Sequence, residues 1–143
     1  MGILVIGYGN PGRLDDGLGP AFAEKIQSLG LPGVTVESNY QLNIEDAELI
    51  SKYATVVFAD ASVNAGEPFE FEPLEKKDPT VGFSSHSISA GALLGLSEEL
   101  FAATPDAFTM AIRGYDFNEF GEWLSGQAQA NLDAAVGFFV DWA

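Results

Sequence analysis

The chain has 143 residues, 47% of them hydrophobic, which excludes a disordered protein and predicts a single domain over residues 1–143. Its 21 Asp and Glu residues outnumber its 6 Lys and Arg residues, and the formal net charge of −15 argues against nucleic acid or anionic membranes as partners. It has no cysteine, no apolar run near the roughly 20 residues that span a bilayer and no basic start to a signal peptide, a combination typical of a cytoplasmic protein.

The first predicted element is a buried strand over residues 2–7, because its apolar run shows no polar alternation. A loop follows that holds three glycines and two adjacent acids: Gly7, Gly9, Gly12, Asp15 and Asp16. Pro20 is tolerated only in the first turn of a helix, so the first helix is expected from about residue 17 to residue 28.

Strands and helices alternate along the rest of the chain. Further strands are expected at residues 34–37, 55–59 and 107–112, and further helices are expected to begin at Asn43, near Ser89 and at Ser125. The alternating phenylalanines and glutamates of residues 69–72 predict a half-exposed strand at a sheet edge over residues 68–74.

This order of elements predicts an α/β fold. We expect a three-layer sandwich in which a mainly parallel twisted sheet of about five strands has helices on both faces and one antiparallel edge strand. Right-handed crossovers place the second strand on one side of the first strand and the third strand on the other. The first and third strands are then neighbours at a switch point, where such folds bind ligands at the carboxyl ends of the strands.

Two carboxylates and the single histidine are expected to meet at that edge. Asp16 lies in the loop after the first strand, Asp60 ends the third strand, and His86 precedes a helix that should pack on the same sheet. This set suits a divalent ion such as zinc or nickel, whereas calcium and magnesium prefer oxygen ligands. Each residue also has a structural interpretation, as a surface histidine, a turn cap or a first-turn helix acid. Because all three residues are expected at one edge of the sheet, the metal-site interpretation is favoured.

The glycine loop also matches the dinucleotide-binding pattern. That alternative would use the loop glycines and the acid at the end of the second strand: Gly7, Gly9, Gly12 and Glu37. However, the helix starts too late for its free amides to meet these glycines, and the acid pair of the loop would repel a pyrophosphate. The chain also leaves little room for a substrate domain.

Several short motifs follow one another in a characteristic order. They are Gly7-x-Gly9-Asn10-x-x-x-x-Asp15-Asp16-Gly17-x-Gly19, then Asp60 followed by Gly66, then Ser85-His86, and finally residues 121–125. The set resembles the hydrogenase maturation proteases over nearly the whole chain. Asp16 stands where some members carry glutamate, so the carboxylate is kept but reaches less far.

The resemblance implies an endopeptidase with the parallel α/β fold predicted above. Such an enzyme removes a C-terminal extension from the large-subunit precursor of a nickel–iron hydrogenase after nickel has been inserted. Asp16, Asp60 and His86 match the metal-binding positions of the family, where the ligands reach nickel that the substrate supplies. Zinc or cadmium would be surrogates. The expected partner is the precursor, and the expected protein is a cytoplasmic monomer that binds neither nucleic acid nor membrane.

The residues that would cleave the peptide bond are less well determined by the sequence. There is no cysteine nucleophile, and the serines beside His86 lack a second histidine as base. Water is therefore the expected nucleophile, activated by the metal or by Asp15 or Asp16 as general base. Besides the dinucleotide-binding module, a non-catalytic metal-binding protein remains an alternative.

Overall fold

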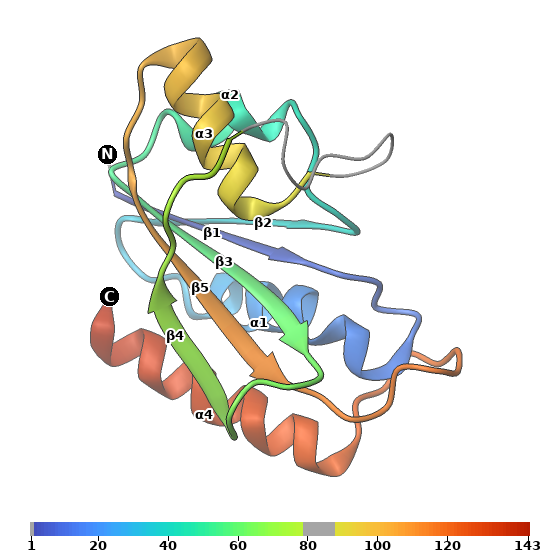
Figure 1. The fold of residues 1–143 in the computed structure, drawn as a ribbon. Coiled ribbons are helices and arrows are strands. Elements are labelled where there is room, and N and C mark those ends of the chain that lie inside the picture. Colours follow the sequence, from blue (N-terminus) through green and yellow to red (C-terminus); the bar gives the residue numbers. More distant parts are fainter. Residues whose placement is uncertain (1, 79–87) are drawn as a thin grey trace.

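A computed structural model describes residues 2–78 and 88–143 (Figure 1). Within these residues the strands are β1 (Ile3–Tyr8), β2 (Val34–Asn39), β3 (Thr55–Ser62), β4 (Phe69–Pro73) and β5 (Asp106–Arg113). The helices are α1 (Leu18–Leu29), α2 (Asp46–Ile50), α3 (Ala90–Phe101) and α4 (Gly126–Trp142), and a 3-10 turn, η1 (Leu14–Gly17), precedes α1. None of the helices in this part of the chain combines the length and apolarity of a membrane span.

The strands form one sheet in the order β2-β1-β3-β5-β4. β1, β2, β3 and β5 run parallel, and β4 pairs antiparallel with β5. The predicted mainly parallel sheet with an antiparallel edge strand is therefore confirmed. β1 and β3 are neighbours, as the crossover rule requires, so the carboxyl ends of both strands meet at one edge of the sheet.

Helices cover both faces of the sheet, with α1 and α4 on one face and α2 and α3 on the other (Figure 1). Val5 of β1 packs into the cluster that contains Phe22 of α1 and Phe139 of α4. Its neighbour Leu4 packs into the opposite cluster, with Leu93 of α3. Because successive side chains enter different clusters, β1 is buried on both faces, which explains its unbroken apolar run.

Three element boundaries near the candidate residues differ from the sequence prediction. β2 runs on to Asn39, so Glu37 lies inside the strand rather than at its end. β3 runs on to Ser62, so Asp60 lies inside the strand rather than at its end. α2 begins at Asp46 rather than at Asn43, because the Asp46 carboxylate accepts a 2.9 Å hydrogen bond from the Asn43 N–H and holds the residues between them as a turn.

Glycine allows the loop and the start of α1 to lie directly on the sheet. A Cβ atom at Gly19 would lie 2.2 Å from the carbonyl oxygen of Tyr8 and 2.7 Å from that of Ala59. Gly9 has φ +141°, and a Cβ atom there would lie 2.2 Å from the carbonyl oxygen of Asp16. These close approaches fix the position of Asp16 above the ends of β1 and β3.

Candidate functional site

Asp16 belongs to η1, just beyond the carboxyl end of β1. Its Oδ2 atom accepts a 3.0 Å hydrogen bond from the N–H of Asn10, and the side chain is only partly buried. The side-chain oxygen of Asn10 accepts a 2.8 Å bond from the N–H of Gly12. The loop therefore folds around Asn10, which holds one oxygen of Asp16 and leaves its carboxylate within reach of solvent.

Asp60 lies near Asp16, on β3, the strand that neighbours β1. In the register of β1 and β3, Gly7 pairs with Ala59, so Tyr8 and Asp60 are the next residues along their strands. The Tyr8 hydroxyl donates a hydrogen bond to the Asp60 carboxylate, whose Oδ1 also accepts a 2.8 Å bond from the following backbone N–H.

The pKa of Asp60 is raised to about 7, first by burial and also by the negative charge of Asp16, while the two hydrogen bonds act in the opposite direction and lower it. Burial and the Asp60 carboxylate likewise raise the pKa of the Tyr8 hydroxyl well above its ordinary value, which keeps it a hydrogen-bond donor. Asp16 and Asp60 are thus close enough to repel each other. The structure brings together these two members of the predicted triad.

Two carboxylates that repel each other favour a cation between them, because the cation removes the repulsion. The donor chemistry of Asp16 and Asp60 therefore fits a divalent ion. Within residues 2–78 and 88–143, no group of three histidine, cysteine, aspartate or glutamate side chains could hold one. His86 and its neighbours Ser84, Ser85 and Ser87 lie outside the described residues, so the complete triad stays a prediction.

Asp15 has an environment quite different from that of Asp16. Its side chain is 0% exposed and accepts hydrogen bonds from the N–H groups of Tyr115 (2.8 Å) and Asp116 (3.0 Å). It also accepts bonds from the N–H and the hydroxyl of Ser125, both at 2.7 Å. Burial alone would raise the pKa of Asp15, but these bonds outweigh it and hold the pKa below its ordinary value. These contacts favour a role as an anchor over a role as general base.

Residues 114–125 pack against the loop that carries Asp15 and Asp16. The sequence showed this segment only as an irregular stretch. The N–H of Leu14 donates to the carbonyl of Gly121 at 2.9 Å, and the N–H of Gly121 donates to the carbonyl of Gly12 at 2.8 Å. The two segments have no periodicity that would reveal this pairing. In the sequence, the importance of this segment was indicated only by its end. Ser125 is a predicted helix cap, and residues 121–125 are the last motif in the ordered set.

The glycine loop does not offer the free amides that a dinucleotide site needs. The N–H of Gly9 donates to the carbonyl of Asn39 at 3.1 Å, and the N–H of Gly12 is held by Asn10. α1 begins only at Leu18, well beyond these glycines. The contacts disfavour the nucleotide-binding alternative, since the amides are already occupied and a carboxylate stands beside them.

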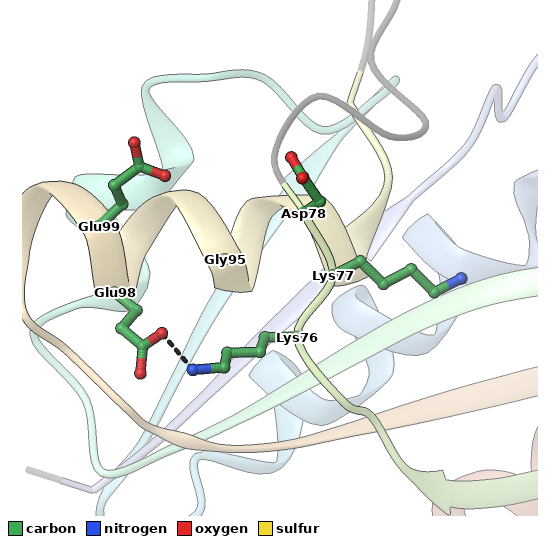
Figure 2. Close-up of a pocket in the computed structure, with 6 residues that line it drawn as sticks. All are labelled: Lys76, Lys77, Asp78, Gly95, Glu98 and Glu99. Carbon is green, nitrogen blue, oxygen red and sulfur yellow. Dashed lines mark hydrogen bonds and ion pairs between the residues drawn. The ribbon is translucent and has the colours of Figure 1, made fainter.

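A hollow of about 430 Å³ on the face covered by α3 offers a poorer site (Figure 2). Lys76 reaches Glu98 of α3 and forms an ion pair with it, while Lys77, Asp78 and Glu99 add further charges. Such an exposed, mixed-charge lining lacks the apolar walls that are typical of a ligand pocket.

Solved structures with this fold include enzymes of hydrogenase maturation. A hydrogenase 2 maturation peptidase from Thaumarchaeota archaeon SCGC_AB-539-E09 is 22% identical, with a TM-score of 0.72 over 99% of this chain and 97% of that one. The [NiFe] hydrogenase maturation protease HycI from Thermococcus kodakarensis KOD1 is 23% identical, with a TM-score of 0.73 over 98% and 90%. The hydrogenase maturating endopeptidase HybD from E. coli is 18% identical, with a TM-score of 0.72 over 99% and 91%.

At these identities the similarity establishes a shared fold along almost the whole chain. No family model and no curated protein matches the sequence.

Proposed function

We propose that this protein is an endopeptidase that removes a C-terminal extension from the large-subunit precursor of a nickel–iron hydrogenase. The observation that carries the proposal is the juxtaposition of Asp16 and Asp60 at the carboxyl ends of β1 and β3. It occurs in a fold shared with proteins named as hydrogenase maturation peptidases, which supports the same reaction class.

In this proposal the nickel arrives with the precursor and is part of the substrate. Asp16 and Asp60 recognise it together with His86, whose imidazole would be the third ligand. The repulsion between the two carboxylates supports this role, because a cation relieves it. Oxygen and nitrogen donors suit nickel, and they would accept zinc or cadmium as surrogates. Three protein ligands leave positions for the precursor's own groups, so binding tightens only when substrate completes the shell.

The cleavage step uses water as the nucleophile, because the chain has no cysteine, and its single histidine, the proposed metal ligand, leaves the serines without a histidine base. Of the two acids in the loop, Asp16 is the better candidate for general base, since it is partly exposed whereas Asp15 is fully buried and holds four donors. The metal ion would supply Lewis-acid polarisation at the scissile group. Asp15 contributes by keeping η1, and with it Asp16, in place.

The test is cleavage of a nickel-loaded large-subunit precursor from the same organism, followed by mass spectrometry of the released peptide. Wild type should release one C-terminal peptide and leave nickel-free precursor intact. Asp16→Asn and Asp60→Asn keep the side-chain shape but remove charge, and each should slow release by about 100-fold or more. Glu99→Gln, an exposed acid on α3, should cleave like wild type. Equal rates for Asp16→Asn and wild type would contradict the proposal.

The Asp16 and Asp60 pair would equally serve a non-catalytic metal-binding protein, and the same experiment separates the two functions. A binding protein would take up nickel or zinc, lose that uptake in His86→Ala, and release no peptide from any precursor.

A further inference from the structure

A groove runs beside the loop that carries Asp16. Two adjoining hollows of about 420 Å³ and about 320 Å³ share the residues Pro11, Pro20 and Ser38. The larger hollow is also lined by residues of η1 and α1 and by the segment before α4, which Figure 1 draws in orange beside the blue start of α1. We call this the α1 groove and define it by Pro11, Pro20, Glu24, Ser38, Glu122 and Trp123.

Each of the two hollows is lined by one large aromatic side chain. Trp123 is 66% exposed, and its ring lies against Gly121, where a Cβ atom would be 2.7 Å from the ring and 2.7 Å from the side chain of Leu14. Tyr40, which lines the smaller hollow, is 71% exposed. Exposed aromatic side chains beside two lining prolines, Pro11 and Pro20, are characteristic of a protein interaction site.

The charged residues that line the α1 groove are all acidic. They are Glu24 and Glu122, and neither has an ion-pair partner within the part of the chain that the structure describes. Residues 114–125 hold three acids and no base. Arg13, the nearby cation of the loop, donates a 2.9 Å hydrogen bond to the carbonyl of Phe117. The hollow on α3, by contrast, mixes lysines with acids (Figure 2).

We propose that the α1 groove docks an apolar and basic segment of a protein partner, in which a large apolar side chain lies between lysines or arginines. The apolar side chain would pack on Trp123, and the cations would face Glu24 and Glu122. The inference rests on the proposed function, in which this partner is the hydrogenase large-subunit precursor. Because the groove adjoins η1 on either side of Asp16, a segment docked there brings its chain to the acid pair.

Docking away from the scissile bond predicts a particular kinetic effect. Trp123→Ala, and separately Glu24→Lys combined with Glu122→Lys, should raise KM for the precursor by about tenfold while kcat stays within about twofold. The controls are Leu100→Ala and Glu99→Lys on α3, which are also exposed and should leave both constants unchanged. An unchanged KM in the groove variants would overturn the inference.

A binding measurement tests the α1 groove without relying on proteolysis. Trp142→Phe leaves Trp123 as the sole tryptophan, so its fluorescence reports the groove. The probes are two short synthetic peptides in which leucine and phenylalanine alternate with lysine or with glutamate. We expect the lysine peptide to shift Trp123 emission saturably and to bind at least about tenfold more tightly than the glutamate peptide. Glu24→Lys with Glu122→Lys should reverse that preference, and thermal unfolding confirms that each variant is folded.

The outcomes separate the two proposals. Equal binding of both peptides, or no change in Trp123 emission, would overturn the inference that the α1 groove is a docking site, even if the precursor is cleaved. Saturable and charge-selective binding without cleavage of any precursor would support docking in the α1 groove and contradict the proposed endopeptidase function.

Discussion

Ser125 donates both its backbone N–H and its hydroxyl to the carboxylate of Asp15, each at 2.7 Å, across 110 positions of the chain. The same hydroxyl oxygen accepts a 3.3 Å bond from the N–H of Ala128 and so caps α4. One side chain therefore joins the start of the last helix to the loop that presents Asp16. The stability of the candidate site is tied to this contact.

Removal of the Asp15 carboxylate should destabilise the whole fold. In Asp15→Ala the buried donors of Tyr115, Asp116 and Ser125 lose their acceptor, which should cost about 2 to 4 kcal/mol in the free energy of unfolding. Urea unfolding monitored by circular dichroism measures this cost. Asp116→Ala removes an exposed carboxylate from the same region and should change stability by no more than about 0.5 kcal/mol. Equal stability of the two variants would refute the anchor role.

The lowered pKa of Asp15 also predicts an acid dependence. A carboxylate whose pKa is lower in the folded state stabilises the fold above its ordinary pKa, and this contribution is lost as the pH falls through the folded value. The stability difference between wild type and Asp15→Asn should therefore be largest near neutral pH and shrink below about pH 4. Urea unfolding of both proteins across this range checks the trend, and a difference that does not vary with pH would exclude it.

Asp60 should show the opposite dependence on pH. Because its pKa is raised to about 7, the folded state binds a proton more tightly than the unfolded state does, and stability falls as the pH rises from about 4 to about 7. In a chelating buffer, Asp60→Asn should be more stable than wild type by about 1 to 3 kcal/mol at about pH 8 and nearly equal to it below about pH 4. Thermal melts at both pH values decide the point, since a variant less stable at the higher pH would be inconsistent with a strained carboxylate.

The close packing of α1 on the sheet gives a prediction with an internal control. Gly19→Ala would place a Cβ atom 2.2 Å from the Tyr8 carbonyl oxygen, against rigid backbone, and should lower stability by about 3 kcal/mol or more. Gly137→Ala in α4 meets no atom within 4 Å and should raise stability by about 0.4 to 1 kcal/mol. Chemical unfolding of both variants provides the measurement. Similar effects of the two substitutions would mean that the contact at Gly19 is not as close as described.

The sequence was sufficient to predict the fold and the meeting of Asp16 with Asp60. The unbroken apolar run of β1 identifies a strand buried on both faces, and right-handed crossovers then place β3 beside it. Both acids follow from that topology, because each lies near the carboxyl end of its strand. The boundary of α2 was less predictable, since it depends on a single contact between Asp46 and the Asn43 N–H.

The different environments of Asp15 and Asp16 could not be predicted from the sequence. The two acids are identical neighbours, and their separation depends on the path of η1, which begins at Leu14 with φ 52°. It also depends on donors from residues 114–125, a segment that lacks the periodicity from which pairing is inferred. The exposure of Trp123 could not be predicted either, because a tryptophan near the start of a helix is as readily buried as exposed.

The outer edge of β4 bears on how the protein behaves in concentrated solution. Phe69 and Phe71 turn inward onto Phe138 and Trp142, while Glu70 and Glu72 project from the other side of the strand. A second copy of this acidic chain aligning there would bring more carboxylates against Glu70 and Glu72, and Pro73 has no backbone N–H to offer at the end of the strand. These features protect β4 from pairing edge to edge with another copy of the chain. Replacing both glutamates with neutral residues should therefore promote fibrous aggregation.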